Sequence, residues 1–378
     1  MLRLTRARAC GRAGASSAPI VLSHCLPCNR SLTARPQAAG DCAGSRRPKS
    51  RCCSSAGGPG EEDLYKDARG HVGLNVLTGV RELRDNITWT TSTVIGNESA
   101  SFDGNVRLIR VTVADHVDIL YGRKVQGSLD TAKWIASFTA PGQFVGVRIP
   151  NASGGEPHVC KRLFNIANSP YESRRDSAYK DASIIEIVAE RSRGGGDEKS
   201  LADMGPGSQI EVSQIVGRGF SSLFNIESNV PSAVEAGRPL LVIALGAHGI
   251  VPVRALLNWT PIQAHATKHR ISCLYVTKSA TTAAFLPGWD LWREAGVSFS
   301  PLYTEVYDPE DPANASEVLG LLDQALFLRE GGFAGIAGSV KDVNVVLAGM
   351  GREMANQVSK RLHAKGVEHE RMLFCDFF

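Results

Sequence analysis

The chain lacks several features that would place it in a large class of proteins. None of its 378 residues lies in an apolar run of about 18, the length needed to span a bilayer. Cysteine is scarce outside the first sixty residues, which hold six of the nine. Cys160, Cys273 and Cys375 are far apart in the sequence, so they indicate neither a disulfide framework nor an iron–sulfur ligand set. There is no internal repeat, and no metal site is predicted.

Acidic residues are nearly absent from residues 1–60. This segment has nine Arg and one Lys against a single acid, Asp41, so it carries +9, whereas the rest of the chain carries −5 of the net +4. The net positive charge of the chain therefore comes from this N-terminal tail and does not indicate a nucleic-acid-binding protein. Because the tail is rich in Arg, Ser and Ala and has no continuous apolar segment, we interpret it as a transit peptide for the chloroplast, or alternatively the mitochondrion. A disordered basic tail that stays attached is the other interpretation.

The rest of the chain changes its pattern near residue 237, and its length suits about two domains. Residues 61–103 are polar and are expected to form an N-terminal extension. Residues 104–236 hold short, β-branched, alternating segments separated by Gly and Pro, which predict an all-β antiparallel barrel. Residues 237–378 alternate between apolar strands and helical stretches, which predicts an α/β doubly wound parallel sheet.

A glycine-bearing turn follows the first predicted strand of the α/β region. The strand ends at Gly246, and Gly249 and Pro252 follow at the start of a predicted helix. Glycine lets the backbone approach a pyrophosphate closely, and a helix N-terminus supplies free N–H groups. The turn is therefore a candidate nucleotide site, although packing alone also explains a glycine there. His248 lies inside the turn, where it could contact a phosphate or obstruct it.

Three elements occur in a characteristic order: PGQF at Pro141–Phe144, the arginine that opens RLFNIANSP at Arg162, and the glycine turn. In this order they resemble the ferredoxin–NADP reductase superfamily over about residues 104–378. The run SQIVGRGF at Ser213–Phe220 looks most like the plastid FAD/NAD(P)-binding oxidoreductase group of plants and algae. The resemblance implies a flavin-binding barrel followed by a nicotinamide-nucleotide domain, with FAD and NADP, or alternatively NAD, as cofactors.

The resemblance implies that the RLFN segment contacts the flavin. Arg162 would bind the flavin pyrophosphate, because its guanidinium suits paired phosphate oxygens. Phe164 stands where the family has tyrosine and would pack on the flavin or ribose. Asn165 stands where the family has Ser or Thr, and its amide would donate to flavin N5. The alternative is that Phe164 belongs to the core and Arg162 forms a surface ion pair.

A second implied flavin element is the glycine turn before a short helix. Gly196 and the Ser200 hydroxyl would hold the pyrophosphate together with neighbouring backbone N–H groups. Glu198 competes for the hydroxyl position, and an acid there would repel phosphate. A flexible hairpin loop is the alternative interpretation of this segment.

The resemblance also implies contacts to the nicotinamide nucleotide. Lys278 and Ser279 lie where the family selects for the 2′-phosphate of NADP. Gly349 and Met354 match the family's C-G-P-x-x-M element, whose cysteine is replaced here by Ala348. A solvated loop lysine remains the alternative for Lys278.

The resemblance implies a flavin-dependent oxidoreductase that transfers a hydride between NAD(P)H and bound FAD. Asn165 and the C-terminal Phe378, which would stack on the flavin, are the expected catalytic residues; a terminal strand that buries Phe378 is the alternative. Electrons would pass on to an acceptor, a small molecule or a redox protein, that the sequence does not name. Because several motif positions are substituted, the second hypothesis is a non-catalytic flavin- or nucleotide-binding or regulatory protein that retains the fold.

Overall fold

A computed structural model of the protein describes residues 88–114, 119–120, 123–124, 134–150, 158–160, 163–177, 182–192, 196–225, 227–306, 312–328 and 332–375. The predicted transit peptide, Arg162 and Phe378 lie outside these residues. Within the described ranges, the helices are all too short or too polar to cross a membrane.

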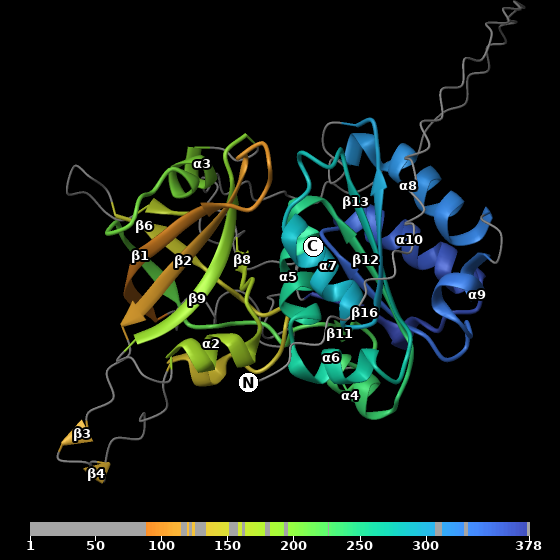
Figure 1. The fold of residues 1–378 in the computed structure, drawn as a ribbon, viewed down its shortest axis with the longest axis horizontal. Helices are drawn as coiled ribbons and strands as arrows, with labels where there is room; N and C mark the ends of the chain where they lie inside the picture. Colours follow the sequence, from red (N-terminus) through yellow and green to blue (C-terminus); the bar gives the residue numbers. More distant parts are fainter. Residues whose placement is uncertain are drawn as a thin grey trace, which may run out of the picture. The chain divides into compact units, whose positions relative to one another are not determined.

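The first region is an antiparallel sheet of six strands in the order β7-β6-β10-β1-β2-β9 (Figure 1). Its pairings are antiparallel throughout, in agreement with the predicted antiparallel β domain. Short pairs β3–β4 and β5–β8 accompany it. The strands are β1 (Trp89–Ser99), β2 (Val106–Ala114), β3 (Ile119–Leu120), β4 (Arg123–Lys124), β5 (Phe144–Val145), β6 (Val147–Ile149), β7 (His158–Val159), β8 (Phe164–Asn165), β9 (Ala182–Glu190) and β10 (Gln209–Ser213). The helices are η2 (Trp134–Ser137), α2 (Pro170–Ser177) and α3 (Gly196–Ala202).

Strand β1 lies in the segment that was expected to be an N-terminal extension. It is a strand of the antiparallel sheet, paired with β10 on one side and β2 on the other. Its sequence, WTTSTVIGNES, is mostly polar, and Ser92 and Val94 are its buried residues. The β-branched threonines favour a strand, but so few apolar residues leave little hydrophobic alternation to read.

The second region is a parallel sheet in the order β11-β16-β15-β12-β13-β14. Only its outer strand β11, which falls in the range predicted for the barrel, pairs antiparallel, with β16. The strands are β11 (Ser221–Ser222), β12 (Leu240–Leu245), β13 (Ile271–Thr277), β14 (Val297–Tyr303), β15 (Asn344–Ala348) and β16 (Met372–Phe374). The helices are α4 (Val230–Glu235), α5 (Gly246–Leu257), α6 (Thr260–Ala266), α7 (Leu286–Glu294), η3 (Pro312–Asn314), α8 (Ala315–Asp323), the π-helical η4 (Gln324–Leu328), α9 (Gly332–Ala337), α10 (Arg352–Ala364) and η5 (His369–Arg371).

Strand β12 lies where the direction of the sheet connections reverses. The chain continues from β12 to β13 and β14 on one side, and later returns to β15 on the other. The carboxyl ends of β12 and β15 therefore form the topological switch point, where open α/β sheets bind ligands. Gly246 follows β12 and Gly349 follows β15, so the sheet brings these two predicted site residues together.

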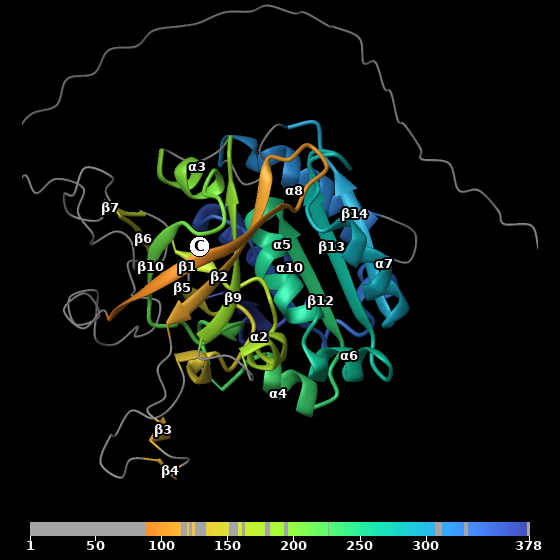
Figure 2. The same ribbon diagram turned by 60° about the vertical axis from the view of Figure 1, so that its left-hand side comes forward.

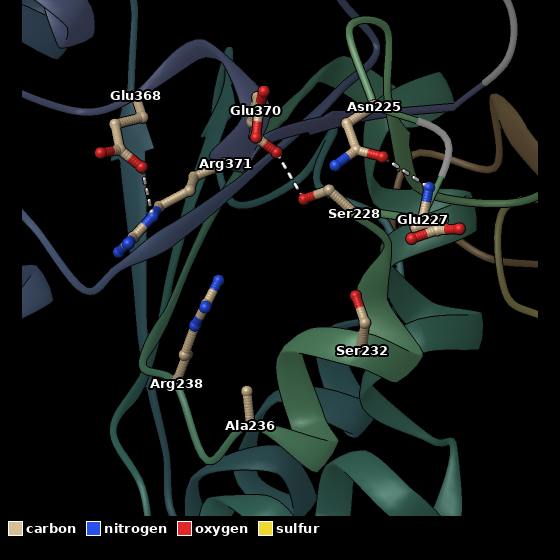
Figure 3. Close-up of a pocket in the computed structure, with 9 residues that line it drawn as sticks. All are labelled: Asn225, Glu227, Ser228, Ser232, Ala236, Arg238, Glu368, Glu370 and Arg371. Atoms are coloured by element: carbon tan, nitrogen blue, oxygen red, sulfur yellow. Dashed lines mark hydrogen bonds and ion pairs between the residues drawn. The ribbon is translucent and has the colours of Figure 1, made fainter.

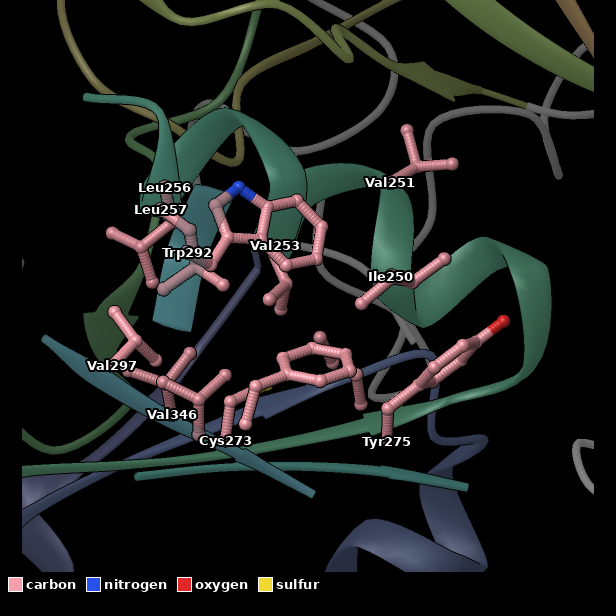
Figure 4. Packing of buried hydrophobic residues seen from close by; sticks show 14 of the residues in the cluster. Ile250, Val251, Val253, Leu256, Leu257, Cys273, Tyr275, Trp292, Val297 and Val346 are labelled. Atoms are coloured by element: carbon pink, nitrogen blue, oxygen red, sulfur yellow. The ribbon is translucent and has the colours of Figure 1, made fainter. Parts of the chain in front are cut away.

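Helix α5 lies between the two sheets (Figure 2) and contacts β12, β13 and β15 as well as β8 and β9. One of its faces packs on the parallel sheet, where Ile250 and Val253 lie over Cys273 and Tyr275 (Figure 4). The same apolar cluster includes Val106, Ala167, Val188 and Phe220 of the first region. One continuous core thus spans both regions, and a separate cluster fills the interior of the antiparallel region. Burial of these apolar side chains is the main contribution that stabilises the packing of the two regions against each other.

Candidate functional site

Helix α5 begins directly after β12, with no intervening loop residue. Gly246 has φ of +58°, a left-handed conformation that a side chain would strain. The preceding residue, Leu245, provides no side-chain cap, so the first N–H groups of α5 are left for other acceptors. The helix N-terminus at the switch point therefore has the electrostatic character of an anion site.

Gly249 and Gly349 are required by packing. A Cβ on Gly249 would lie 2.6 Å from the carbonyl oxygen of Ala348, at the end of β15. Gly349 has φ of +72°, and a Cβ there would lie 2.5 Å from the Gly249 Cα and would collide with the Leu245 carbonyl oxygen. The two glycines let α5 sit directly on the ends of β12 and β15. Pro252 is buried inside the same helix.

A cluster of three titratable side chains covers the start of α5. His248 Nε2 lies 3.2 Å from Glu198 Oε1 of α3 and 3.5 Å from Glu190 Oε1, at the end of β9. The three side chains are only 9–10% exposed. Glu198 Oε1 also accepts a hydrogen bond of 3.1 Å from the backbone N–H of Glu190. The cluster therefore joins the two regions at the glycine turn.

This cluster bears on whether a nucleotide pyrophosphate fits at the start of α5. Two carboxyl groups lie within 3.5 Å of His248 Nε2, a side chain of the glycine turn. A carboxylate disfavours a phosphate close to it, so this cluster is the feature of the turn that fits a pyrophosphate least well.

The PGQF motif and the SQIVGRGF run lie against each other. Gln143 is buried, and its Oε1 accepts from the backbone N–H groups of Thr139 (2.7 Å) and Ala140 (3.0 Å). Its Nε2 donates to the Gly217 carbonyl (2.9 Å). A Cβ on Gly219, whose φ is +75°, would lie 2.5 Å from the Pro141 carbonyl oxygen. These contacts therefore hold in place the segment that leads into β5, the partner strand of β8.

Strand β8 carries two of the predicted flavin residues. Phe164 is 2% exposed and belongs to the apolar cluster of the antiparallel region, as the core alternative expected. Asn165 is 9% exposed, and its Nδ2 donates to the Gly142 carbonyl (3.1 Å). A primary amide has two N–H donors, so one remains for a ligand.

Helix α3 carries the second predicted flavin element. Gly196 has open space around it, with no heavy atom within 4 Å of a Cβ position. The exposed Ser200 hydroxyl donates to the Gly196 carbonyl (2.5 Å) within the helix. Glu198, on the buried side of α3, is committed to the His248 contact.

The remaining predicted nucleotide residues lie at two strand ends. Lys278 and Ser279 follow β13, and the Ser279 hydroxyl accepts from the Thr282 N–H (3.3 Å) within its own turn. Met354 lies in the first turn of α10, is 5% exposed and packs in an apolar cluster with residues of the parallel sheet. The structure thus brings Gly246, Gly249 and Gly349 together and places Met354 in the core.

A polar pocket of 280 Å³ lies elsewhere, near the amino ends of β12 and β16 (Figure 3). Arg238 points into it, whereas Arg371 turns toward Glu368 and bonds its carboxylate at 3.0 Å. This edge is opposite the switch point, so the pocket is separate from the candidate nucleotide site.

Cys160, Cys273 and Cys375 are buried and form no disulfide. Burial raises the pKa of the Cys273 thiol well above its usual range, so this residue is an inert core thiol. In the described part of the chain, no group of three or more His, Cys, Asp or Glu side chains is arranged to hold a metal ion.

Comparison with known proteins identifies distant similarities. No protein-family profile matches the chain. It is 24% identical over 241 residues to the fruit protein pKIWI502 of Actinidia deliciosa, covering 63% of this chain and 67% of that protein. Among solved structures, the flavohem-like FAD/NAD binding domain of nitric oxide dioxygenase from Vibrio cholerae aligns with a TM-score of 0.48 at 15% identity, over 75% of this chain and 97% of that one. The ferredoxin NADP+ reductase from Neisseria gonorrhoeae aligns with a TM-score of 0.46 at 12% identity, over 74% and 92% of the two chains.

Proposed function

We propose that the protein is a flavin-dependent oxidoreductase that transfers a hydride between NAD(P)H and bound FAD. The observation that supports this most directly is the position of α5. This helix begins at the switch point of the parallel sheet, and its Arg254 Nη1 donates to the Ala167 carbonyl (2.7 Å), two residues beyond Asn165. The same helix contacts β8, the strand that carries Asn165, so one element joins the candidate nucleotide site to the candidate flavin strand.

Within this proposal, the chain's own residues bind and orient the two cofactors. The second amide N–H of Asn165 would donate to the flavin, Arg162 and the backbone near Gly196 would hold its pyrophosphate, and Lys278 would hold the NADP 2′-phosphate. The flavin supplies the hydride-accepting chemistry. Phe378 would cover the flavin face, and a small molecule or redox protein would accept the electrons. We also propose that residues 1–60 direct the protein to the chloroplast.

An anaerobic spectrum tests the function. The full chain is purified, and its visible absorbance is recorded before and after addition of NADPH. A flavin band that bleaches is the expected result. A protein without a flavin band after attempted FAD reconstitution would contradict the proposal.

Arg162→Ala tests the flavin site itself. We expect flavin binding to weaken at least roughly tenfold, because a charge-assisted phosphate contact is lost. The matched control is Arg175→Ala, since Arg175 is 61% exposed and pairs with Asp176 on the surface. Flavin occupancy after dialysis should fall only in the first variant; equal occupancy in both would remove Arg162 from the site.

The second candidate function is a non-catalytic binding or regulatory protein that retains the fold. The observation that favours it is the Glu190–His248–Glu198 cluster, which places two carboxyl groups within 3.5 Å of a side chain in the glycine turn. This alternative predicts a colourless protein, or a yellow one whose spectrum does not respond to NADPH.

A further inference from the structure

We infer that the polar pocket beside Arg238 binds a small zwitterion, a molecule that carries both a carboxylate and an ammonium group, such as an α-amino acid. The pocket lies near the amino ends of β12 and β16, at the edge of the parallel sheet opposite the candidate nucleotide turn. Its ligand would be additional to the cofactors of the proposed function, and the inference does not rest on that function.

Arg238 supplies the group that would bind the carboxylate. Its guanidinium points into the pocket (Figure 3) and forms no hydrogen bond or ion pair with any residue in the described part of the chain. Its backbone is held in place, because the N–H donates to the Ala233 carbonyl (3.0 Å) and the carbonyl bonds His265 Nε2 (2.8 Å). A guanidinium presents a planar set of N–H donors that matches a carboxylate. Arg238 is therefore positioned to bind one.

The other charges of the pocket favour a ligand that also carries positive charge. Arg371 Nε pairs with Glu368 at 3.0 Å, so these two side chains add no net charge. Glu227 and Glu370 also line the pocket, and neither carboxylate bonds to a residue that the structure describes. One guanidinium and two carboxylates are then left for the ligand. A phosphate would be repelled by the two acids, whereas a zwitterion complements both signs of charge.

Two serine hydroxyls add hydrogen-bond acceptors on the side of the pocket that faces Arg238 (Figure 3). Ser228 Oγ donates to the Glu370 carbonyl (2.5 Å), and Ser232 Oγ donates to the Asn229 carbonyl (2.9 Å). A hydroxyl has one hydrogen, so each of these oxygens can only accept a further bond. An ammonium group, which has three donors and no acceptor, suits such oxygens.

The size of the pocket limits the ligand to a small molecule. Its volume is 280 Å³, which is below the roughly 300–1,000 Å³ of sites that hold drug-sized ligands. A dinucleotide cofactor is therefore too large for it. The bonds from Ser228 to Glu370 and between Asn229 and Ser232 fix the lining segments before a ligand arrives. Such preorganisation lowers the entropic cost of binding.

A binding screen with the full chain tests the class of ligand. Each of the twenty common amino acids is added separately and followed by saturation-transfer NMR, and titration calorimetry then measures the strongest binder. We expect a dissociation constant below about 1 mM, and binding at least about tenfold tighter than that of acetate, ethylammonium or inorganic phosphate. Failure of every amino acid to bind, or equally tight binding of acetate or phosphate, would overturn the inference.

Substitutions locate the site. Arg238→Gln should weaken amino-acid binding at least about tenfold, because the charge-assisted contact to the carboxylate is lost. Ala236→Leu places a larger side chain in the same pocket without a change of charge and should also weaken binding. The matched control is Arg270→Gln, since Arg270 is exposed outside the pocket and makes one long bond to the Ala334 carbonyl (3.3 Å). Parent-like affinity in folded Arg238→Gln, or an equal loss in the control, would overturn the inference.

A double variant, Glu227→Gln with Glu370→Gln, tests the ammonium contact. We expect amino-acid binding to weaken at least about fivefold and acetate binding to be no weaker than in the parent. Unchanged amino-acid affinity would show that the acids do not contact the ligand and would rule out the zwitterion. Thermal melting establishes that each variant is folded. The response of the visible spectrum to NADPH is a separate measurement, so the proposed function can fail while amino-acid binding stands, and the reverse.

Discussion

Two polar contacts along α5 join the same pair of regions, and their charge balance is opposite. Around Glu186, two guanidinium groups surround one carboxylate: Arg110 at 2.7 Å and Arg254 at 2.8 Å. Around His248, two carboxylates surround one imidazole. Glu186 and Glu190 are four residues apart on β9, so they lie on the same face of that strand.

The difference indicates which contact contributes more to stability. The Glu186 carboxylate is 5% exposed and lies against two cations. The His248 contact has two acids for one base, so its charges are less well balanced. We therefore expect the Glu186 contact to stabilise the packing of α5 against the first region more than the His248 contact does.

The largest effect is expected from breaking the first contact. Arg254→Ala leaves the 5%-exposed Glu186 side chain with one cation and removes a hydrogen bond to Ala167. We expect unfolding free energy to fall by about 3 kcal/mol. Urea denaturation followed by tryptophan fluorescence measures it. Arg110→Ala is the comparison: it also leaves Glu186 with one cation, but Arg110 is 50% exposed, so water can replace part of its contact and we expect a smaller loss than for Arg254→Ala. Equal losses of unfolding free energy would mean that Arg254 does not contribute more than Arg110 to the packing of the two regions.

Gly249→Ala should break the packing that positions the His248 contact. The added Cβ would meet the Ala348 carbonyl oxygen at 2.6 Å, so α5 must move away from β15. We expect a loss of about 1–3 kcal/mol in unfolding free energy. At Gly196 the same substitution meets open space and should change stability by less than about 1 kcal/mol. If both variants unfold at the same urea concentration, the close approach of Gly249 to Ala348 does not determine the cost of a side chain there.

His265 is expected to make the folding stability of the protein depend on pH. Burial lowers the pKa of His265, which is 4% exposed and hydrogen-bonded to the Arg238 carbonyl at 2.8 Å. The unfolded chain, with a pKa of about 6.5, then binds the proton more readily. Stability should be constant above that value and fall as pH drops through it. Melting temperatures from pH 8 to pH 5 measure this, and His265→Gln should flatten the curve; an unchanged curve would assign the titration to another group.

The smallest effect is expected at the far end of α5. The Glu172–Asn258 hydrogen bond is long, at 3.4 Å, and Glu172 is partly exposed. Glu172→Gln should lower the unfolding free energy by less than about 1 kcal/mol, because the amide oxygen can still accept a hydrogen bond. Asn258→Ala is not suitable for this test, since Asn258 Oδ1 also accepts from the buried Trp292 Nε1 (2.7 Å). A loss of unfolding free energy as large as that of Arg254→Ala would mean that this end of α5 contributes as much to the packing of the two regions.

The sequence predicted the parallel sheet well, because its strands are continuous apolar runs. LLVIAL, ISCLYVT and NVVLA form β12, β13 and β15, and almost every residue in them is buried. Strands β1 and β11 were not anticipated as members of their sheets. Their residues are mostly Thr and Ser, and pairing with distant strands, which a local pattern does not encode, makes them part of each sheet.

The candidate site was predicted in part. The glycine turn at Gly246–Gly249 lies at the switch point, as the strand–turn–helix pattern indicated. Met354 is a core residue, because helical spacing alone does not distinguish a ligand contact from a core contact. Glu190 was not singled out, although a glutamate at the end of a mostly apolar strand was a usable signal.

By itself, the sequence determined the two kinds of sheet, their order along the chain and the position of the glycine turn, because hydrophobic periodicity and glycine conformation are local properties. Only the tertiary structure decided what covers that turn. His248 and Glu198 are 50 residues apart and belong to different regions. Their contact depends on how α5 packs against the first region, and a local sequence pattern does not encode that packing.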